Sequence, residues 1–193
     1  MAKKLYLMRH GQTLFNIRRM IQGASDSPLT EVGIKQAQIA KQYFENNGIV
    51  FDYAYSSTQE RAVDTLELVT DMPYERLKGL KEWNFGTFEG ESEDLNPKVL
   101  SDQGTYGDFF THYNGESDLE VQNRMVQTLT ELMEKEDHQN ILAVSHGGAC
   151  TMFRKKWTGT LGKTRNCSIL VFDYDEGAFT FQEVIDHDFS LLS

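Results

Sequence analysis

Two histidines of the sequence each come just after a short apolar run and just before a glycine. His10 follows Leu5 to Met8, and His146 follows Ile141 to Val144. Such runs are typical of buried strands, and we expect both to be parallel strands of one sheet. Because parallel strands end at the same edge of a sheet, the two imidazoles should lie close together there.

Two arginines are expected at the same edge. Arg9 adjoins His10, and Arg61 lies in the first turn of a helix that should begin just after a strand. Two guanidinium groups and two imidazoles form an anion site, and the bidentate geometry of arginine suits phosphate oxygens. Taken singly, such residues are more often structural or solvated. Their recurrence at two strand ends, beside glycines that let a ligand approach the backbone, favours a phosphate site.

A longer segment around His10 resembles a known signature. Leu7-Met8-Arg9-His10-Gly11-Gln12-Thr13, followed by Asn16, is similar to the motif of the histidine phosphatase superfamily, which includes the cofactor-dependent phosphoglycerate mutases. Further matches follow in the family's order: Gln22-Gly23, Leu29 to Gly33, Ser56-Ser57 with Arg61-Ala62 and Thr65, Glu82 with Gly86 and Glu89-Gly90, Gly115 to Ser117, and Ser145 to Gly148. An Arg-His-Gly tripeptide alone would be weak, but ordered blocks over nearly the whole chain are a strong signal.

The resemblance implies roles for two reacting groups. His10 would be the nucleophile, whose imidazole nitrogen attacks phosphorus to form a phosphohistidine. Glu82 would protonate the leaving alkoxide and then deprotonate the attacking water. Without its surroundings, Glu82 would be interpreted as a surface carboxylate in a charged loop. The matching Gly86 and Glu89-Gly90 favour the catalytic role.

The resemblance also implies a set of phosphate ligands. The three nonbridging oxygens would be held, and their charge stabilised, by Arg9, Arg61 and His146. Outer contacts to phosphate or substrate are expected from Asn16, Gln22 and Gly147. Fixed cations of this kind make Mg²⁺ unnecessary, and no carboxylate cluster in the sequence suits a metal. We therefore expect neither a metal nor a cofactor.

The phosphoryl group on His10 could pass to water or to a second substrate hydroxyl. Where the mutases have Glu-Arg-His-Tyr-Gly, this chain has Glu82-Trp83-Asn84-Phe85-Gly86, which lacks the arginine for a substrate carboxylate. The irregular segment 91–116, expected to be a lid-like insertion, also looks shorter than its mutase counterpart. The sequence favours a phosphomonoester hydrolase for a small phosphorylated metabolite. The alternatives are a phosphoglycerate mutase and, less favoured, a phosphate-binding protein without activity.

Length and composition predict one soluble domain over residues 1–193. The chain is 39% hydrophobic and 25% charged, and it is long enough to bury a core without disulfides. A net charge of −10 argues against nucleic acids and anionic membranes as partners. The first apolar run is too short for a signal peptide or a spanning helix, so a cytoplasmic location is expected. The oligomeric state stays open, with a homodimer among the alternatives.

Strands and helices are expected to alternate along the chain. Apolar patterns predict strands over 5–8, 51–55 and 141–144 and a helix over 30–47. Capping-box patterns at Ser57 to Glu60 and at Ser117 to Glu120 predict the starts of two further helices. The stretch from Asn166 to Ile185 indicates a hairpin that turns at Asp175 to Gly177. We predict an α/β protein, a three-layer α/β/α sandwich with a mixed, mostly parallel central sheet.

Other residues are given plainer interpretations. His112 and His138 are expected to be surface histidines, and Cys150 and Cys167 are expected to be small core residues. Many aromatic residues come after Glu82 in the sequence, and we expect them to form a satellite core rather than a cleft wall. They are Trp83, Phe85, Phe88, Tyr106, Phe109 and Phe110.

Overall fold

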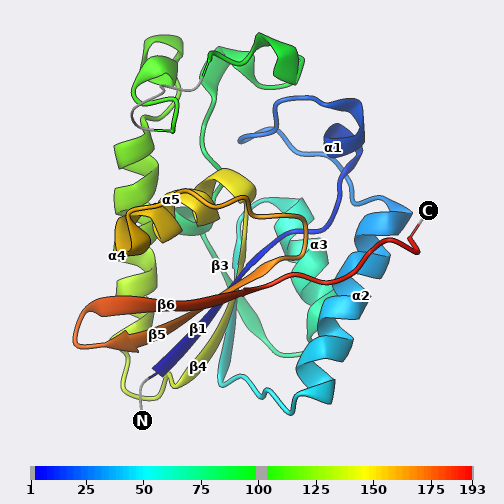
Figure 1. Ribbon diagram of the computed structural model, residues 1–193, viewed down its shortest axis with the longest axis vertical. Helices are drawn as coiled ribbons and strands as arrows, with labels where there is room; N and C mark the ends of the chain where they lie inside the picture. Colours follow the sequence, from blue (N-terminus) through cyan, green and yellow to red (C-terminus); the bar gives the residue numbers. More distant parts are fainter. Residues whose placement is uncertain (1–2, 99–103, 193) are drawn as a thin grey trace.

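The computed structural model describes residues 3–98 and 104–192, which form a six-stranded sheet with helices on both faces (Figure 1). The strands are β1 (Lys3–Arg9), β2 (Tyr53–Ser57), β3 (Tyr74–Leu77), β4 (Asn140–Ser145), β5 (Ile169–Asp175) and β6 (Ala178–Ile185). Their order across the sheet is β3-β2-β4-β1-β5-β6. The first four run parallel, whereas β5 is antiparallel to both of its neighbours. The prediction of a mixed, mostly parallel sheet is confirmed.

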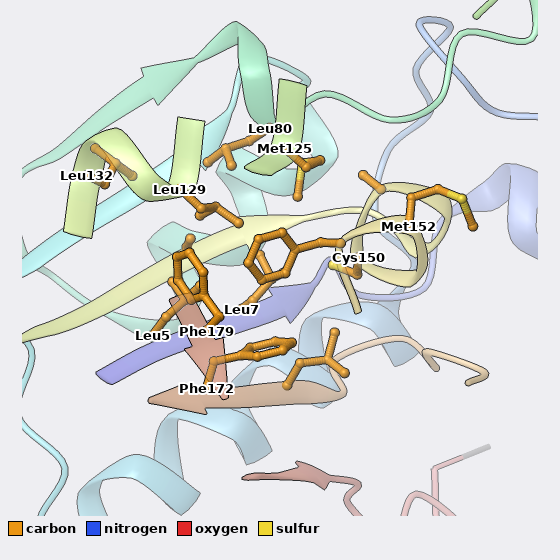
Figure 2. Close-up of a cluster of buried hydrophobic side chains, with 14 of the residues drawn as sticks. Leu5, Leu7, Leu80, Met125, Leu129, Leu132, Cys150, Met152, Phe172 and Phe179 are labelled. Atoms are coloured by element: carbon orange, nitrogen blue, oxygen red, sulfur yellow. The ribbon is translucent and has the colours of Figure 1, made fainter. Parts of the chain in front are cut away.

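Two pairs of helices cover the sheet. One face carries α2 (Glu31–Asn46) and α3 (Glu60–Val69), and the other carries α4 (Asp118–Met133) and α5 (Gly147–Thr158). Side chains of β1 alternate between the faces: Tyr6 and Met8 join the first apolar cluster, and Leu5 and Leu7 join the second. Figure 2 shows the second cluster, with side chains from β1, α4, α5 and β5 gathered between sheet and helices. The predicted α/β/α layering is confirmed.

Short helices occupy the connections near the carboxyl ends of β1 and β4. They are α1 (Leu14–Arg18) and the 3₁₀ helices η1 (Lys78–Leu80), η2 (Gly86–Phe88), η3 (Glu93–Leu95) and η4 (Phe109–Tyr113). In Figure 1, α1 and the chain that carries η3 and η4 lie beyond the sheet at this end. The connections therefore gather on the side where the histidines were predicted.

The predicted lid-like insertion, 91–116, falls partly on residues 99–103, which lie outside the described residues. Its beginning is joined to the loop after β1, because Ile21 N donates to Glu91 O at 2.8 Å and Glu93 N donates to Arg19 O at 2.8 Å. That the insertion is lid-like stays a prediction, as does the assignment of the chain to one domain.

The aromatic residues after Glu82 pack on one another and on the cluster beneath α4 and α5. Phe110 lies at their centre and is completely buried. The prediction of a satellite core is confirmed, but the prediction that these rings form no cleft wall is wrong for Trp83, Phe85 and Tyr106, which also line the cavity described below.

One of the two predicted capping boxes is wrong. Ser117 caps α4, with its hydroxyl accepting from Glu120 N and the Glu120 carboxylate accepting from Ser117 N. Ser57 instead ends β2, and its hydroxyl bonds to Gln59, which is the residue before α3. Pairing of β2 with β3, in which Ser57 stands opposite Leu77, requires extended backbone further along the chain than the predicted 51–55.

The interpretation of His138 as a surface residue is also wrong. Only 2% of it is exposed, its Nε2 lies 2.6 Å from Tyr55 Oη, and its Nδ1 lies 2.8 Å from Asp137 Oδ1. Its ring stacks on Tyr53 at 3.8 Å between centroids. His112 is exposed, as predicted. Cys150 and Cys167, also as predicted, are buried and unpaired.

Candidate active site

The parallel pairing of β1 with β4 brings the two predicted histidines together. Arg9 stands opposite Ser145 in the register, and His10 N donates to Ser145 O at 3.0 Å. The imidazoles of His10 and His146 follow directly, with 5.2 Å between ring centroids. Both side chains are buried.

The surroundings of His10 leave one ring nitrogen suited to nucleophilic attack. Nδ1 lies 2.7 Å from Gly11 O, and because a carbonyl oxygen only accepts, Nδ1 must carry the proton. Nε2 therefore carries no proton, and its lone pair accepts a hydrogen bond from Arg61 Nε at 3.3 Å. Burial, followed by the charges of Arg61 and Arg9, lowers the pKa of His10 well below its usual value. The imidazole is thus held neutral, which is the form that a nucleophile requires.

Arg61 is held by the loop that follows α1. Its side chain is completely buried, and Nη1 donates to Ser25 O at 3.0 Å and to Asp26 Oδ1 at 2.9 Å. Nη2 donates to Gly23 O at 2.9 Å. These contacts leave Nε and one Nη2 hydrogen for the region of His10 Nε2. The loop thereby aims a buried cation at the predicted nucleophile.

Several buried nitrogens around His10 have no hydrogen-bond partner. They are Nε of Arg9 and both ring nitrogens of His146. Burial, with the charge of Arg61 next, lowers the pKa of His146 well below its usual value, so this ring is also neutral and can donate one hydrogen bond. Unpaired buried polar groups cost free energy, and an anion's oxygens would supply the missing acceptors.

Glu82 lies at the amino end of α5. Its carboxylate accepts hydrogen bonds from Trp83 N at 2.8 Å, Gly148 N at 3.0 Å and Ala149 N at 2.9 Å. A Cβ atom at Gly148 would stand 2.7 Å from Glu82 Oε1, so only a glycine lets the carboxylate come this close. Free N–H groups and the helix dipole favour a carboxylate at this place.

The loop before Glu82 is fixed by a residue that the sequence analysis did not single out. Arg124 of α4 donates to Gly79 O at 3.0 Å, to Lys81 O at 2.6 Å and to Glu82 O at 2.9 Å. It also forms two hydrogen bonds with the Glu116 carboxylate, at 2.7 and 2.9 Å. Nothing in the sequence around Arg124 distinguishes it from a solvated arginine on a helix.

A cavity of about 470 Å³ opens at this centre. Six of the predicted site residues line it: Arg9, His10, Asn16, Gln22, Glu82 and Gly147. Arg61 and His146 lie beside His10 but behind the cavity surface, because their side chains are completely buried. All predicted site residues are thus gathered in one place.

Asn16 and Gln22 are oriented by neighbouring side chains and backbone. Asn16 Oδ1 accepts from Thr13 N at 3.1 Å and from Asn166 Nδ2 at 3.2 Å. Gln22 Oε1 accepts from the Thr13 hydroxyl at 2.8 Å, and its Nε2 donates to Ser27 Oγ at 3.1 Å. Both amides therefore face the cavity from fixed positions.

Within residues 3–98 and 104–192, no group of three or more His, Cys, Asp or Glu side chains is arranged to hold a metal ion. No helix in the described part of the chain has the length and apolar character needed to cross a membrane.

Comparison with known proteins decides the family. The model of the histidine phosphatase superfamily, branch 1, matches residues 5–187. The chain belongs to this superfamily. A probable phosphoglycerate mutase, GpmB, from Yersinia pestis is 34% identical, and the match covers 90% of this chain and 86% of that protein. The protein is therefore an enzyme, either a phosphatase or a mutase.

Solved structures agree with this assignment. Phosphoglycerate mutase from Bacillus anthracis superimposes with a TM-score of 0.84 at 28% identity, covering 94% of this chain and 92% of that one. A mutant phosphoserine phosphatase from Entamoeba histolytica, solved with phosphoserine, has a TM-score of 0.80 at 29% identity, covering 94% and 95%. A putative α-ribazole-5′-phosphate phosphatase from Escherichia coli has a TM-score of 0.77 at 27% identity, covering 94% and 95%.

Proposed function

We propose that the protein is a phosphomonoester hydrolase that acts on a small phosphorylated metabolite through a phosphohistidine on His10. The observation that carries this proposal is the state of His10, a buried neutral imidazole whose Nδ1 donates to Gly11 O and whose Nε2 carries no proton and accepts from Arg61 Nε. This nitrogen is surrounded by two arginines and by a second neutral histidine with unpaired ring nitrogens.

In the first step, His10 Nε2 attacks phosphorus and the bond from phosphorus to the leaving oxygen breaks. Arg9 Nε, Arg61 Nε and one His146 N–H donate to the three nonbridging oxygens, over which the charge of the transition state is spread. Arg61 Nε, which donates to His10 Nε2 in the free enzyme, is released for this contact when the nitrogen bonds to phosphorus. Glu82 takes a proton from the phosphate group of the bound substrate and passes it to the leaving alkoxide.

In the second step, the Glu82 carboxylate takes a proton from water while the water oxygen attacks phosphorus. The bond from phosphorus to His10 Nε2 breaks, inorganic phosphate leaves with the proton that Glu82 took from the water, and the free imidazole and the Glu82 carboxylate are restored. The other carboxylates near the site are unsuited to this work. Both oxygens of Glu116 are bound by Arg124, and those of Glu89 accept backbone N–H groups of Ala24 and Ser25.

Transfer to water, rather than to a second hydroxyl, is supported by the residues that replace the mutase Arg-His pair. Trp83 is buried, and its indole N–H donates to Glu116 O at 2.7 Å. The Asn84 amide bonds to Gly86 N and Asn114 O, and it does not line the cavity. Neither side chain supplies a cation for a substrate carboxylate. Phosphoglycerate mutase activity is the alternative, favoured by the names of several relatives.

The test compares phosphate release from a panel of phosphomonoesters with isomerisation of 3-phosphoglycerate, with 2,3-bisphosphoglycerate present to prime His10. We expect phosphate release to exceed isomerisation greatly. Acid-quenched enzyme should carry an acid-labile, base-stable phosphoryl label, and His10→Ala should abolish both label and turnover. Efficient isomerisation would establish the mutase instead, and a label on Ser, Asp or Cys would refute the nucleophile.

A further inference from the structure

The cavity extends beyond the phosphate centre into a region with a different character. It is lined there by Met20, Phe85, Tyr106, Met152 and Leu161, which come from the loop after α1, the aromatic segment, α5 and the loop after α5, and by the uncharged polar Asn96, Thr105 and Thr151. We call this region the leaving-group chamber, because a phosphoryl group at His10 would direct its ester oxygen past Glu82 toward it. The chamber walls therefore combine apolar and aromatic side chains with uncharged polar ones.

Charge is sparse in the chamber. Among the described residues that line the cavity, the cations are Arg9, which belongs to the phosphate centre, and Lys163, an exposed residue. The acidic Glu93, also in the lining, is paired at 3.8 Å with Arg19, which does not line the cavity. A substrate carboxylate placed here would lose its hydration without gaining a guanidinium partner, which is costly.

The size of the cavity also favours a substrate with a large, uncharged group. The whole cavity of about 470 Å³ lies within the range of roughly 300–1,000 Å³ that is usual for drug-sized ligands. A three-carbon acid would leave most of the apolar wall in contact with water. A larger apolar group would cover that wall, and Phe85 and Tyr106 offer rings for edge or face contacts with an aromatic one.

We propose that the enzyme prefers phosphomonoesters whose alcohol is a large, uncharged group with an apolar or aromatic body, over esters of small carboxylated alcohols. This inference rests on the proposed function for its biological meaning. What it predicts is a difference in binding affinity at the chamber, and this difference can be measured with compounds that the enzyme does not hydrolyse.

The measurement uses two phosphonates that the enzyme cannot hydrolyse, 2-phenylethylphosphonate and 2-carboxyethylphosphonate. They differ only in the group that would enter the chamber. We expect calorimetric titration of the wild-type protein to show about 10–100-fold tighter binding of the phenyl compound, the range for burying one ring. Equal affinities, or a preference for the carboxylate, would overturn the inference.

Two matched variants show whether the preference arises in the chamber. Leu161 is 37% exposed and lies on the chamber wall, whereas Leu191 is 94% exposed and does not line the cavity. Leu161→Lys adds a cation there and should reduce the ratio of affinities at least about fivefold, since a cation partner offsets carboxylate desolvation. Leu191→Lys should leave the ratio unchanged. A ratio altered equally in both variants would contradict a role for the chamber.

Kinetics separate the two proposals. Phosphate release from 2-phenylethyl phosphate should be faster than from 3-phosphoglycerate or phosphoserine at equal low concentration. Release that is fastest from the carboxylated esters refutes the inference and leaves the phosphatase assignment intact. The phosphonate preference without phosphate release from any ester refutes the phosphatase and leaves the binding preference intact.

Discussion

Replacement of Glu82 by Gln separates acid catalysis from the other contributions to the reaction. If Glu82 protonates the leaving oxygen, the variant should cleave an alkyl phosphate about 10²–10⁴-fold more slowly, the range for a general acid. A nitrophenolate leaves without a proton, so phosphorylation of His10 by a nitrophenyl ester should slow far less. Loss of the base should then delay hydrolysis, and phosphohistidine should accumulate.

The structure predicts what the same substitution does to stability. Three backbone N–H groups donate to the Glu82 carboxylate, and an amide retains one acceptor oxygen but places an NH₂ group against the remaining donors. The free energy of unfolding should therefore fall by about 1–3 kcal/mol, the cost of leaving a buried donor unsatisfied. This change is large enough to require a control.

Glu89 is the matched control, because its carboxylate also accepts three backbone N–H groups, from Ala24, Ser25 and Phe85. Glu89→Gln should lose a similar amount of stability, yet slow alkyl and nitrophenyl esters by the same factor, since Glu89 does not line the cavity. The assay is rapid-quench measurement of His10 phosphorylation with both esters. Equal slowing of the two esters in the Glu82→Gln variant would mean that Glu82 is not the acid.

Three further predictions concern other parts of the site. Arg124→Lys keeps the positive charge but loses the planar guanidinium that binds Glu116 and the carbonyl oxygens of Lys81 and Glu82. Cleavage of alkyl esters should therefore be about 10–100-fold slower, and cleavage of nitrophenyl esters should be less affected. Equal slowing of both esters would indicate a purely structural role. Activity should survive EDTA, because fixed arginines and a histidine supply the positive charge, and loss that Mg²⁺ or Zn²⁺ restores would refute this. The free energy of unfolding should fall as the pH drops below about 6.5. In the folded chain the pKa values of His10 and His146 are lowered, so both stay neutral, whereas in the unfolded chain both bind protons at this pH. Denaturant titrations at two pH values test this, and a His10→Gln, His146→Gln variant with the same pH slope as the wild type would contradict it.

The centre of the site could be predicted from the sequence because it depends on local patterns. An apolar run followed by His and Gly predicts a strand end, and two parallel strand ends meet at one edge of a sheet whatever the rest of the fold does. The role of Arg124 could not be predicted, because the carbonyl oxygens that it binds lie about forty positions earlier in the chain, in a loop whose path no local pattern determines. The error at His138 has the same origin, since Tyr53 and Tyr55, which bury it, belong to β2.

Gln59 shows how the phosphate ligands and the proton donor are held in one arrangement before a substrate binds. Its buried amide donates to Gly23 O, the same oxygen that accepts from Arg61 Nη2 at 2.9 Å. Its Oε1 accepts from Glu82 N at 2.8 Å. One side chain thus connects the loop that aims Arg61 at the phosphoryl group with the residue that would protonate its leaving oxygen. Groups fixed in this way need little reorganisation when charge develops, which is the condition for strong electrostatic stabilisation of a transition state.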